Sequence, residues 1–390
     1  MKMEDVSGAP APSQAIPVES DDVAGQWHRV VRRRAFLKVG AGVAAAAIPA
    51  GGLLATNAAA AGSTLNKGDA AILRFLAAAE IIESDLWVQY DELGGVKGGN
   101  AAYILALQNL DGDMPQYITD NTDDELSHAA FLNAYLKSRG AQPVNLDKFR
   151  TLSSSKATGA RQIGRLTNLQ NLVVDTSWYT RYRSSENPDF GAPPRQAIQI
   201  VNEPAIPLND ADTSPGQQQP VPPTTPSQQR MQAIANTAGF HFGYIEQGGS
   251  SLYTALSLKA SDLEVLRIIV SIGGVEVDHF SLWHDKLGNA VAQPLAGVKD
   301  PETGVTFPDL NVPPGRELFQ TNKILPEPTD FISKGLPECS VIRPSAIENA
   351  GAVATIKSFT ADLLFQGQSK EFFDTVMELA RAADAARRTL

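Results

Sequence analysis

Two Glu-x-x-His pairs constrain this chain more than any other feature of its sequence. They are Glu125 with His128 and Glu276 with His279, and each pair falls in a stretch whose apolar residues recur at helical spacing. Residues three apart on an α-helix project from one face, about one turn apart. Each pair therefore presents a carboxylate and an imidazole together, which is half of the ligand set of a metal site.

A single glutamate in an apolar helical stretch precedes each pair: Glu80 before the first and Glu246 before the second. Glu83, one turn after Glu80, is an alternative ligand. The spacing of Glu80 to Trp87 equals that of Glu246 to Tyr253, and this favours Glu80. The order along the chain is thus Glu, Glu-x-x-His, a long gap, Glu, Glu-x-x-His.

Chance and burial both favour a metal site. With five histidines in the chain, random placement would give roughly a quarter of one Glu-x-x-His match, whereas two occur. The alternative, core histidines with salt-bridged glutamates, would bury four acids in apolar stretches at several kcal/mol per charge. A pair of divalent cations removes this conflict, and carboxylate and imidazole ligands suit two Fe or Mn ions.

Apolar periodicity predicts further helices and their ends. The expected helices cover residues 69–93, 101–110, a segment ending near 140, 229–257, a segment ending at 288, 345–365 and 370–388. The helix that carries Glu125 begins either at a capping box at Thr122 or after Asp113 with Pro115 in its first turn; we favour the longer helix. A capping box at Ser261 is expected to start the helix of the second pair.

The other histidines of these helices are expected to lie outside the site. His241 faces away from Glu246 and is predicted to be structural, whereas His284 is predicted to be exposed.

The connection at 141–228 is rich in proline over its second half and too long for a simple up-and-down arrangement. It suits two helical hairpins joined by one long crossover. We therefore expect an all-α fold: a ferritin-like four-helix bundle over residues 66–290, in which the polar, Pro-rich loop of this insertion is a surface or assembly element. Residues 291–390 would add a Pro-rich segment and two C-terminal helices that serve packing or oligomer contacts.

The segments around these ligands resemble the bacterial ferritin-like domain family, many of whose members are exported and loosely described as desiccation- or stress-related. The resemblance covers about residues 66–290 and rests on four stretches: Ala79–Glu83, Asp124–Leu132, Ile245–Gly248 and Glu276–His279. It implies that Glu125 and Glu276 bridge two metals. The resemblance also implies that each metal has terminal ligands, which are Glu80, Glu246, His128 and His279.

The first 61 residues predict export. Residues 1–31 are polar without helical period and are expected to be disordered. Arg33-Arg34 followed by Phe36-Leu37-Lys38 and an Ala/Gly-rich apolar run resembles a twin-arginine signal, with Ala59–Ala61 suited to cleavage. A permanent transmembrane helix is disfavoured by Pro49 and the weak hydrophobicity of Ala and Gly. The expected location is the periplasm or the exterior, without stable membrane insertion.

Charge and cysteine content narrow the function. The chain has 33 basic and 43 acidic residues, a net charge of −10, which argues against nucleic acid as a partner. The single cysteine, Cys339, excludes an intramolecular disulfide.

The leading expectation is a di-iron or di-manganese protein that reacts with oxygen or peroxide in stress protection. The alternatives are iron oxidation and storage, which the crossover disfavours by obstructing a cage, and a non-enzymatic interaction protein with a structural or vestigial metal site; a homo-oligomer is possible.

Overall fold

The computed structural model describes residues 64–181, 196–212, 221–310, 326–327, 332–333, 335–340 and 351–389. The expected leader and signal, residues 1–61, lie outside this described part. Among the described helices, none is both long and apolar enough to span a membrane.

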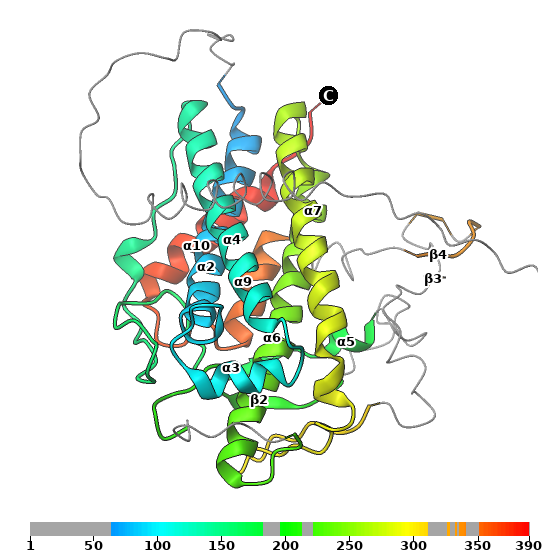
Figure 1. Cartoon of the computed structure of the whole chain (residues 1–390). Coiled ribbons are helices and arrows are strands. Elements are labelled where there is room, and N and C mark those ends of the chain that lie inside the picture. Colours follow the sequence, from blue (N-terminus) through cyan, green and yellow to red (C-terminus); the bar gives the residue numbers. More distant parts are fainter. Residues whose placement is uncertain are drawn as a thin grey trace, which may run out of the picture. The chain divides into compact units, whose positions relative to one another are not determined.

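The described chain is mostly helical, which is compatible with the expected all-α class (Figure 1). The helices are α2 (Lys67–Gly94), α3 (Ala101–Gln108), α4 (Met114–Ser138), α5 (Ser177–Arg181), α6 (Pro226–Ser257), α7 (Leu263–Lys286), α9 (Ala352–Ala361) and α10 (Lys370–Ala385), with 3-10 turns η1 (Asp147–Phe149) and η3 (Leu287–Val291). Two short antiparallel sheets pair β1 (Leu172–Val174) with β2 (Ile200–Glu203) and β3 (Pro326–Glu327) with β4 (Cys339–Ser340).

The four long helices share one core. α2 packs along α4, and α6 packs along α7 (Figure 1). The ring of Trp87 on α2 stacks on Phe242 of α6 and on Trp283 of α7, at centroid distances of 4.9 and 5.6 Å. The indole N–H of Trp283 donates to Asn121 of α4 at 2.8 Å. Residues from all four helices therefore meet in the interior.

A proline in its first turn marks where α4 begins. α4 starts at Met114 after Asp113, with Pro115 in its first turn, as in the favoured prediction. A proline fits there because the first N–H groups of a helix have no partner within the helix. Thr122, the alternative start, lies inside the helix and donates its hydroxyl to the carbonyl of Ile118 at 2.7 Å. Glu125 therefore lies in the middle of α4, where it is held rigidly.

Two other helix starts differ from the prediction. α7 is capped by Asp262 and not by Ser261: the carboxylate of Asp262 accepts from the backbone N–H of Glu264, at 2.8 Å. The backbone N–H groups of Ser261 and Asp262 instead donate to Asp69 of α2, both at 2.9 Å. α6 starts at Pro226, earlier than expected, after a capping box formed by Thr225.

The C-terminal helices complete the described core. α10 packs against α2 and α9, and its carboxylate Asp384 accepts the first N–H groups of α9, from Ala352 and Val353. α9 ends at Ala361, before the predicted end at 365, because Leu363 takes a positive φ of 66° and turns the chain; the predicted residues 345–350 lie outside the described part.

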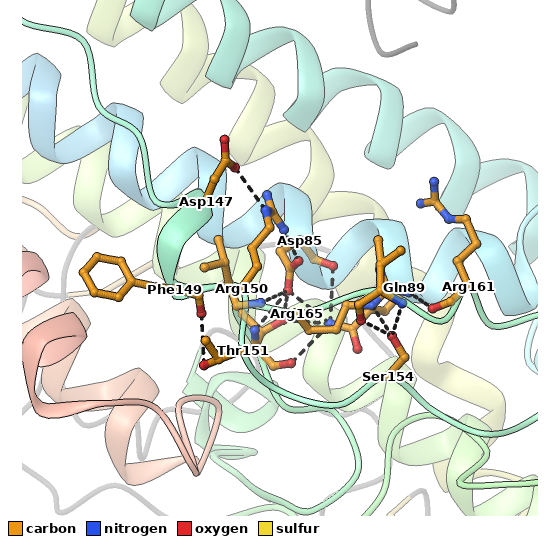
Figure 2. A network of polar contacts seen from close by, with 12 residues as sticks. Asp85, Gln89, Asp147, Phe149, Arg150, Thr151, Ser154, Arg161 and Arg165 are labelled. Atoms are coloured by element: carbon orange, nitrogen blue, oxygen red, sulfur yellow. Dashed lines mark hydrogen bonds and ion pairs between the residues drawn. The ribbon is translucent and has the colours of Figure 1, made fainter. Parts of the chain in front are cut away.

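The first part of the long connection is fastened to α2 (Figure 2). Asp85 of α2 is 1% exposed and accepts from the backbone N–H groups of Leu166 and Thr167, both at 2.9 Å. Arg150 donates to the same carboxylate at 2.5 Å. Arg165, also buried, pairs with Glu92 of α2. This part of the connection is therefore an integral layer over α2.

Replacing Asp85 with alanine is expected to lower the free energy of unfolding by about 3 kcal/mol, because two buried backbone N–H groups and Arg150 lose their acceptor. Urea denaturation followed by circular dichroism measures this change. Lys370→Ala, which breaks the exposed pair with Asp374, is the control and should cost less than about 0.5 kcal/mol. Equal effects for the two variants would contradict a structural role for this network.

Candidate metal centre

The six predicted residues come together inside the four long helices. Glu80 comes from α2, the first pair from α4, Glu246 from α6 and the second pair from α7. Their ligand atoms form two groups, each with all its atoms within 4.8 Å of one another. The first group is Glu80, Glu125, His128 and Glu276; the second is Glu125, Glu246, Glu276 and His279. Each group can hold a metal ion, and the two groups share Glu125 and Glu276.

His128 faces the carboxylates of the first group with one ring nitrogen. Its Nδ1 lies 3.2 Å from Oε2 of Glu125 and 3.4 Å from oxygens of Glu80 and Glu276. The imidazole is 7% exposed, while Glu80 is 1% and the other two glutamates 0% exposed. The three acids come from three different helices, α2, α4 and α7, and all three approach the same nitrogen.

His279 has the corresponding position in the second group. Its Nδ1 lies 3.0 Å from Oε1 of Glu125 and 3.3 Å from Oε2 of Glu246. Its other nitrogen, Nε2, lies 3.2 Å from Oδ2 of Asp124, close enough for a hydrogen bond. A carboxylate on the far nitrogen of a histidine fixes the ring orientation and tautomer.

Several atoms aimed into the cluster make no hydrogen bond. Within the described residues they are Oε2 of Glu80, Oε2 of Glu246, both carboxylate oxygens of Glu276 and Nδ1 of His279. Buried polar atoms without partners are rare because each costs free energy. Lone pairs on oxygen and imidazole nitrogen are what a divalent cation takes, so the residues present fit a metal ion.

The buried acids shift one another's pKa. Burial and then the charge of Glu80 raise the pKa of Glu125 to about 7. Burial, with the charges of Glu125 and Glu80, raises the pKa of Glu276 well above its usual value. Burial acts in the same direction on Glu80, but His128 outweighs it and lowers the pKa of that carboxyl. The cluster thus retains protons at a pH where exposed carboxylates are ionised.

Burial acts on the histidines in the opposite sense, but their net pKa values are raised as well. Burial lowers the pKa of His128, and the nearby carboxylates of Glu125 and Glu276 outweigh it, so that the net pKa is raised. For His279 the lowering by burial is outweighed by Glu246 and Asp124, and its pKa is also raised. Acids and imidazoles therefore stabilise one another by sharing protons.

Asn121 and Tyr253 support the ligands and were not singled out as site residues from sequence. Asn121, 2% exposed, donates through Nδ2 to Oε1 of Glu125 at 3.1 Å and to Oε1 of Glu246 at 3.0 Å. The hydroxyl of Tyr253 donates to Glu80. Asn121 precedes Glu125 by one helical turn, and that spacing is the signal that could have found it.

Glu83, the alternative to Glu80, is buried near the cluster but belongs to neither ligand group. Burial and the charge of Glu125 raise its pKa well above the usual value. Its Oε1 has no hydrogen-bond partner within the described residues. The structure therefore places Glu80 among the candidate ligands and leaves Glu83 beside them.

The remaining two helical histidines lie outside the cluster. His241 is buried, hydrogen-bonded to Tyr90, and belongs to neither ligand group, so it lies outside the cluster as expected. The expected exposure of His284 is wrong: it is 2% exposed, with its ring against Trp178 and Phe280. Trp178 belongs to α5 in the long connection, and it covers a face of α7 that the periodicity of α7 alone predicts to be free.

Comparisons with protein-family models, with curated proteins and with solved structures found no match for this chain.

Gly249 leaves room for Glu276. A Cβ at Gly249 would overlap Oε2 of Glu276, whereas a Cβ at the neighbouring Gly248 would meet nothing within 4 Å. Gly249→Ala is expected to displace the carboxylate and lower the free energy of unfolding by about 1–3 kcal/mol. Gly248→Ala, the matched control on the same helix, should leave stability unchanged or raise it by up to about 1 kcal/mol. Thermal unfolding compares the two, and equal losses would contradict close packing at Gly249.

The metal-free protein is expected to lose stability as pH rises from about 5 to 8. The pKa of Glu125 is about 7 in the folded chain against 4.5 for an ordinary glutamate, so the folded state binds the extra proton between these values. The raised histidine pKa values act in the same direction. Melting temperature across this range tests the sign, and Glu125→Gln should flatten the curve. A melting temperature that rises with pH would contradict the assignment.

Proposed function

We propose that this chain is a ferritin-like metal protein whose six-residue cluster binds two ions of iron or manganese. The observation that carries the proposal is the overlap of the two ligand groups in Glu125 and Glu276. Glu125 and Glu276 would each serve both ions, because each belongs to both ligand groups. Both carboxylate oxygens of Glu276 are buried and make no hydrogen bond within the described residues, which supports a bridging role.

The proposed fold is a ferritin-like four-helix bundle formed by α2, α4, α6 and α7. In proteins of this class one glutamate comes from each of two helices, and a Glu-x-x-His pair from each of the other two. The order of the candidate ligands on these four helices and the long connection between α4 and α6 support this assignment. So does the resemblance of the ligand-bearing segments to the bacterial ferritin-like domain family.

The proposed reaction is with oxygen or peroxide, in protection against stress. A bound pair of redox-active ions supplies Lewis acidity and electrons for such a reaction. The residues of the chain prepare the site. Asn121 holds Glu125 and Glu246, Asp124 orients His279, and Tyr253 hydrogen-bonds Glu80. The buried rings of Trp87 and Trp283 lie in the core beside the site and help to exclude water.

Export through the twin-arginine pathway gives this proposal a physical rationale. Nitrogen and oxygen ligands have greater raw affinity for copper or zinc than for manganese or iron. A protein that folds around its metals before export takes them from the cytosolic supply, where the ion is selected by availability. The protein would then act in the periplasm or outside the cell.

Metal content of the natively exported protein tests the function. We expect about two Fe or Mn per chain in the wild type and loss of both in a Glu276→Ala/His279→Ala variant. His284→Gln, on the same helix but outside the cluster, is the matched control and should retain the metals. Elemental analysis and melting temperature are measured on each protein.

The opposite result would change the assignment. A wild type without metal, and a double variant that melts unchanged, would favour a non-enzymatic interaction protein with a vestigial site. Native copper or zinc would contradict the proposed redox chemistry. A closed cage of many subunits by light scattering would favour iron storage instead.

A further inference from the structure

A hydrogen-bonded residue links the candidate ligands to a buried tryptophan. Asn121 donates to Glu125 and Glu246 and accepts from the indole N–H of Trp283 at 2.8 Å. Trp283 is 1% exposed. The cluster is therefore in contact, through a single side chain, with an aromatic ring that can be oxidised by one electron.

Aromatic contacts extend this link away from the cluster. Trp283 stacks on Trp87 with ring centroids 5.6 Å apart and an angle of 19° between the rings. Trp87 lies 5.7 Å from Tyr90, and Phe242 packs against all three rings. Trp87, Tyr90 and Phe242 are each 0% exposed. Electron transfer between neighbouring rings at such contact distances is efficient, so the series forms a continuous path.

The path ends at a phenol and an imidazole. The hydroxyl of Tyr90 and Nδ1 of His241 are 2.7 Å apart, and both residues are 0% exposed. Burial lowers the pKa of His241 to about 3, so the imidazole is neutral. In the tautomer that carries its hydrogen on Nε2, Nδ1 accepts the phenolic hydrogen of Tyr90. Phenylalanine and leucine would fill the same space without burying polar groups, whose burial has a free-energy cost. Packing alone does not account for this pair.

We propose that Tyr90 is a redox-active residue that gives one electron, through Trp87 and Trp283, to a one-electron oxidant held at the Glu/His cluster. As the electron leaves, the O–H bond of Tyr90 breaks and its proton forms an N–H bond at Nδ1 of His241. The products are a neutral tyrosyl radical, an imidazolium and an oxidant reduced by one electron, so charge and atoms balance. The inference rests on the proposed function, because the oxidant arises from metal and peroxide at the cluster.

The arrangement separates the radical from the site that generates it. Tyr253 is nearer to the cluster, since its hydroxyl donates to Glu80. Its proton acceptor would be a candidate metal ligand, and transfer of the proton would weaken that ligand. The partner of Tyr90 is an imidazole that belongs to neither ligand group. Tyr90 can therefore return to its starting state by recovering the proton and an electron, without disturbing the site.

Freeze-quench electron paramagnetic resonance tests the inference. The full exported chain is loaded with Fe²⁺, mixed with hydrogen peroxide and frozen within milliseconds; metal content is measured on the same sample. We expect a tyrosyl signal that narrows when the protein carries ring-deuterated tyrosine. Tyr90→Phe should abolish the signal, and Trp283→Phe should diminish it.

A matched tyrosine variant distinguishes this assignment from others. Tyr103→Phe removes another fully buried hydroxyl, which donates to the carbonyl of Ala205 and lies off the path; the signal should persist. A signal that survives Tyr90→Phe, or that Tyr103→Phe abolishes equally, would overturn the inference. Bound iron without a tyrosyl signal overturns the inference and leaves the proposed function standing, whereas absence of bound metal overturns both.

Discussion

The burial of four carboxylates beside two imidazoles is the constraint on which the rest of the structure depends. Moving such charges out of water costs several kcal/mol per group unless they are compensated. The cluster compensates in part by retaining protons, as the raised pKa values of Glu125 and Glu276 indicate. Within the described residues the carboxylate oxygens of Glu276 make no hydrogen bond, so hydrogen bonds do not satisfy every buried atom. A bound cation would meet the remaining requirement.

Because burying these carboxylates costs free energy, the residues around them must hold each ligand in place. Asn121 ties ligands of α4 and α6 together, and the absence of a side chain at Gly249 makes room for Glu276. Farther out, the long connection is fastened to α2 by Asp85, and α10 packs on the same helix. The extra segments beyond the four long helices thus stabilise α2, which carries Glu80. Their length is explained at least in part by this structural role.

The aromatic core has two roles that are physically compatible. Large rings such as those of Trp87 and Trp283 contribute apolar burial that offsets the cost of the charged interior. In the proposed electron-transfer path, the same stacked rings carry the electron between the cluster and the Tyr90–His241 pair. A polar pair at the end of an otherwise apolar core is the feature that separates the second role from the first.

Sequence periodicity was sufficient to locate the long helices and to group the site residues by face. It joined Glu125 to His128 and Glu276 to His279 because residues three apart on a helix share a face whatever surrounds them. The longer start of α4 followed from a proline whose fixed backbone suits a first turn. Helix faces and helix starts depend on residues that are close in the chain, so they can be predicted from the sequence.

Contacts between helices were decided by the tertiary structure. Asp69 of α2 accepts a hydrogen bond from the backbone N–H of Ser261, and Asp262, not Ser261, caps α7. Trp178 covers His284, which its own helix predicts to be exposed. The sequence by itself determined which side chains share a helix face, because helical geometry is local. Only the tertiary structure decided which faces meet, since that depends on how distant segments pack and on which buried polar atoms find partners.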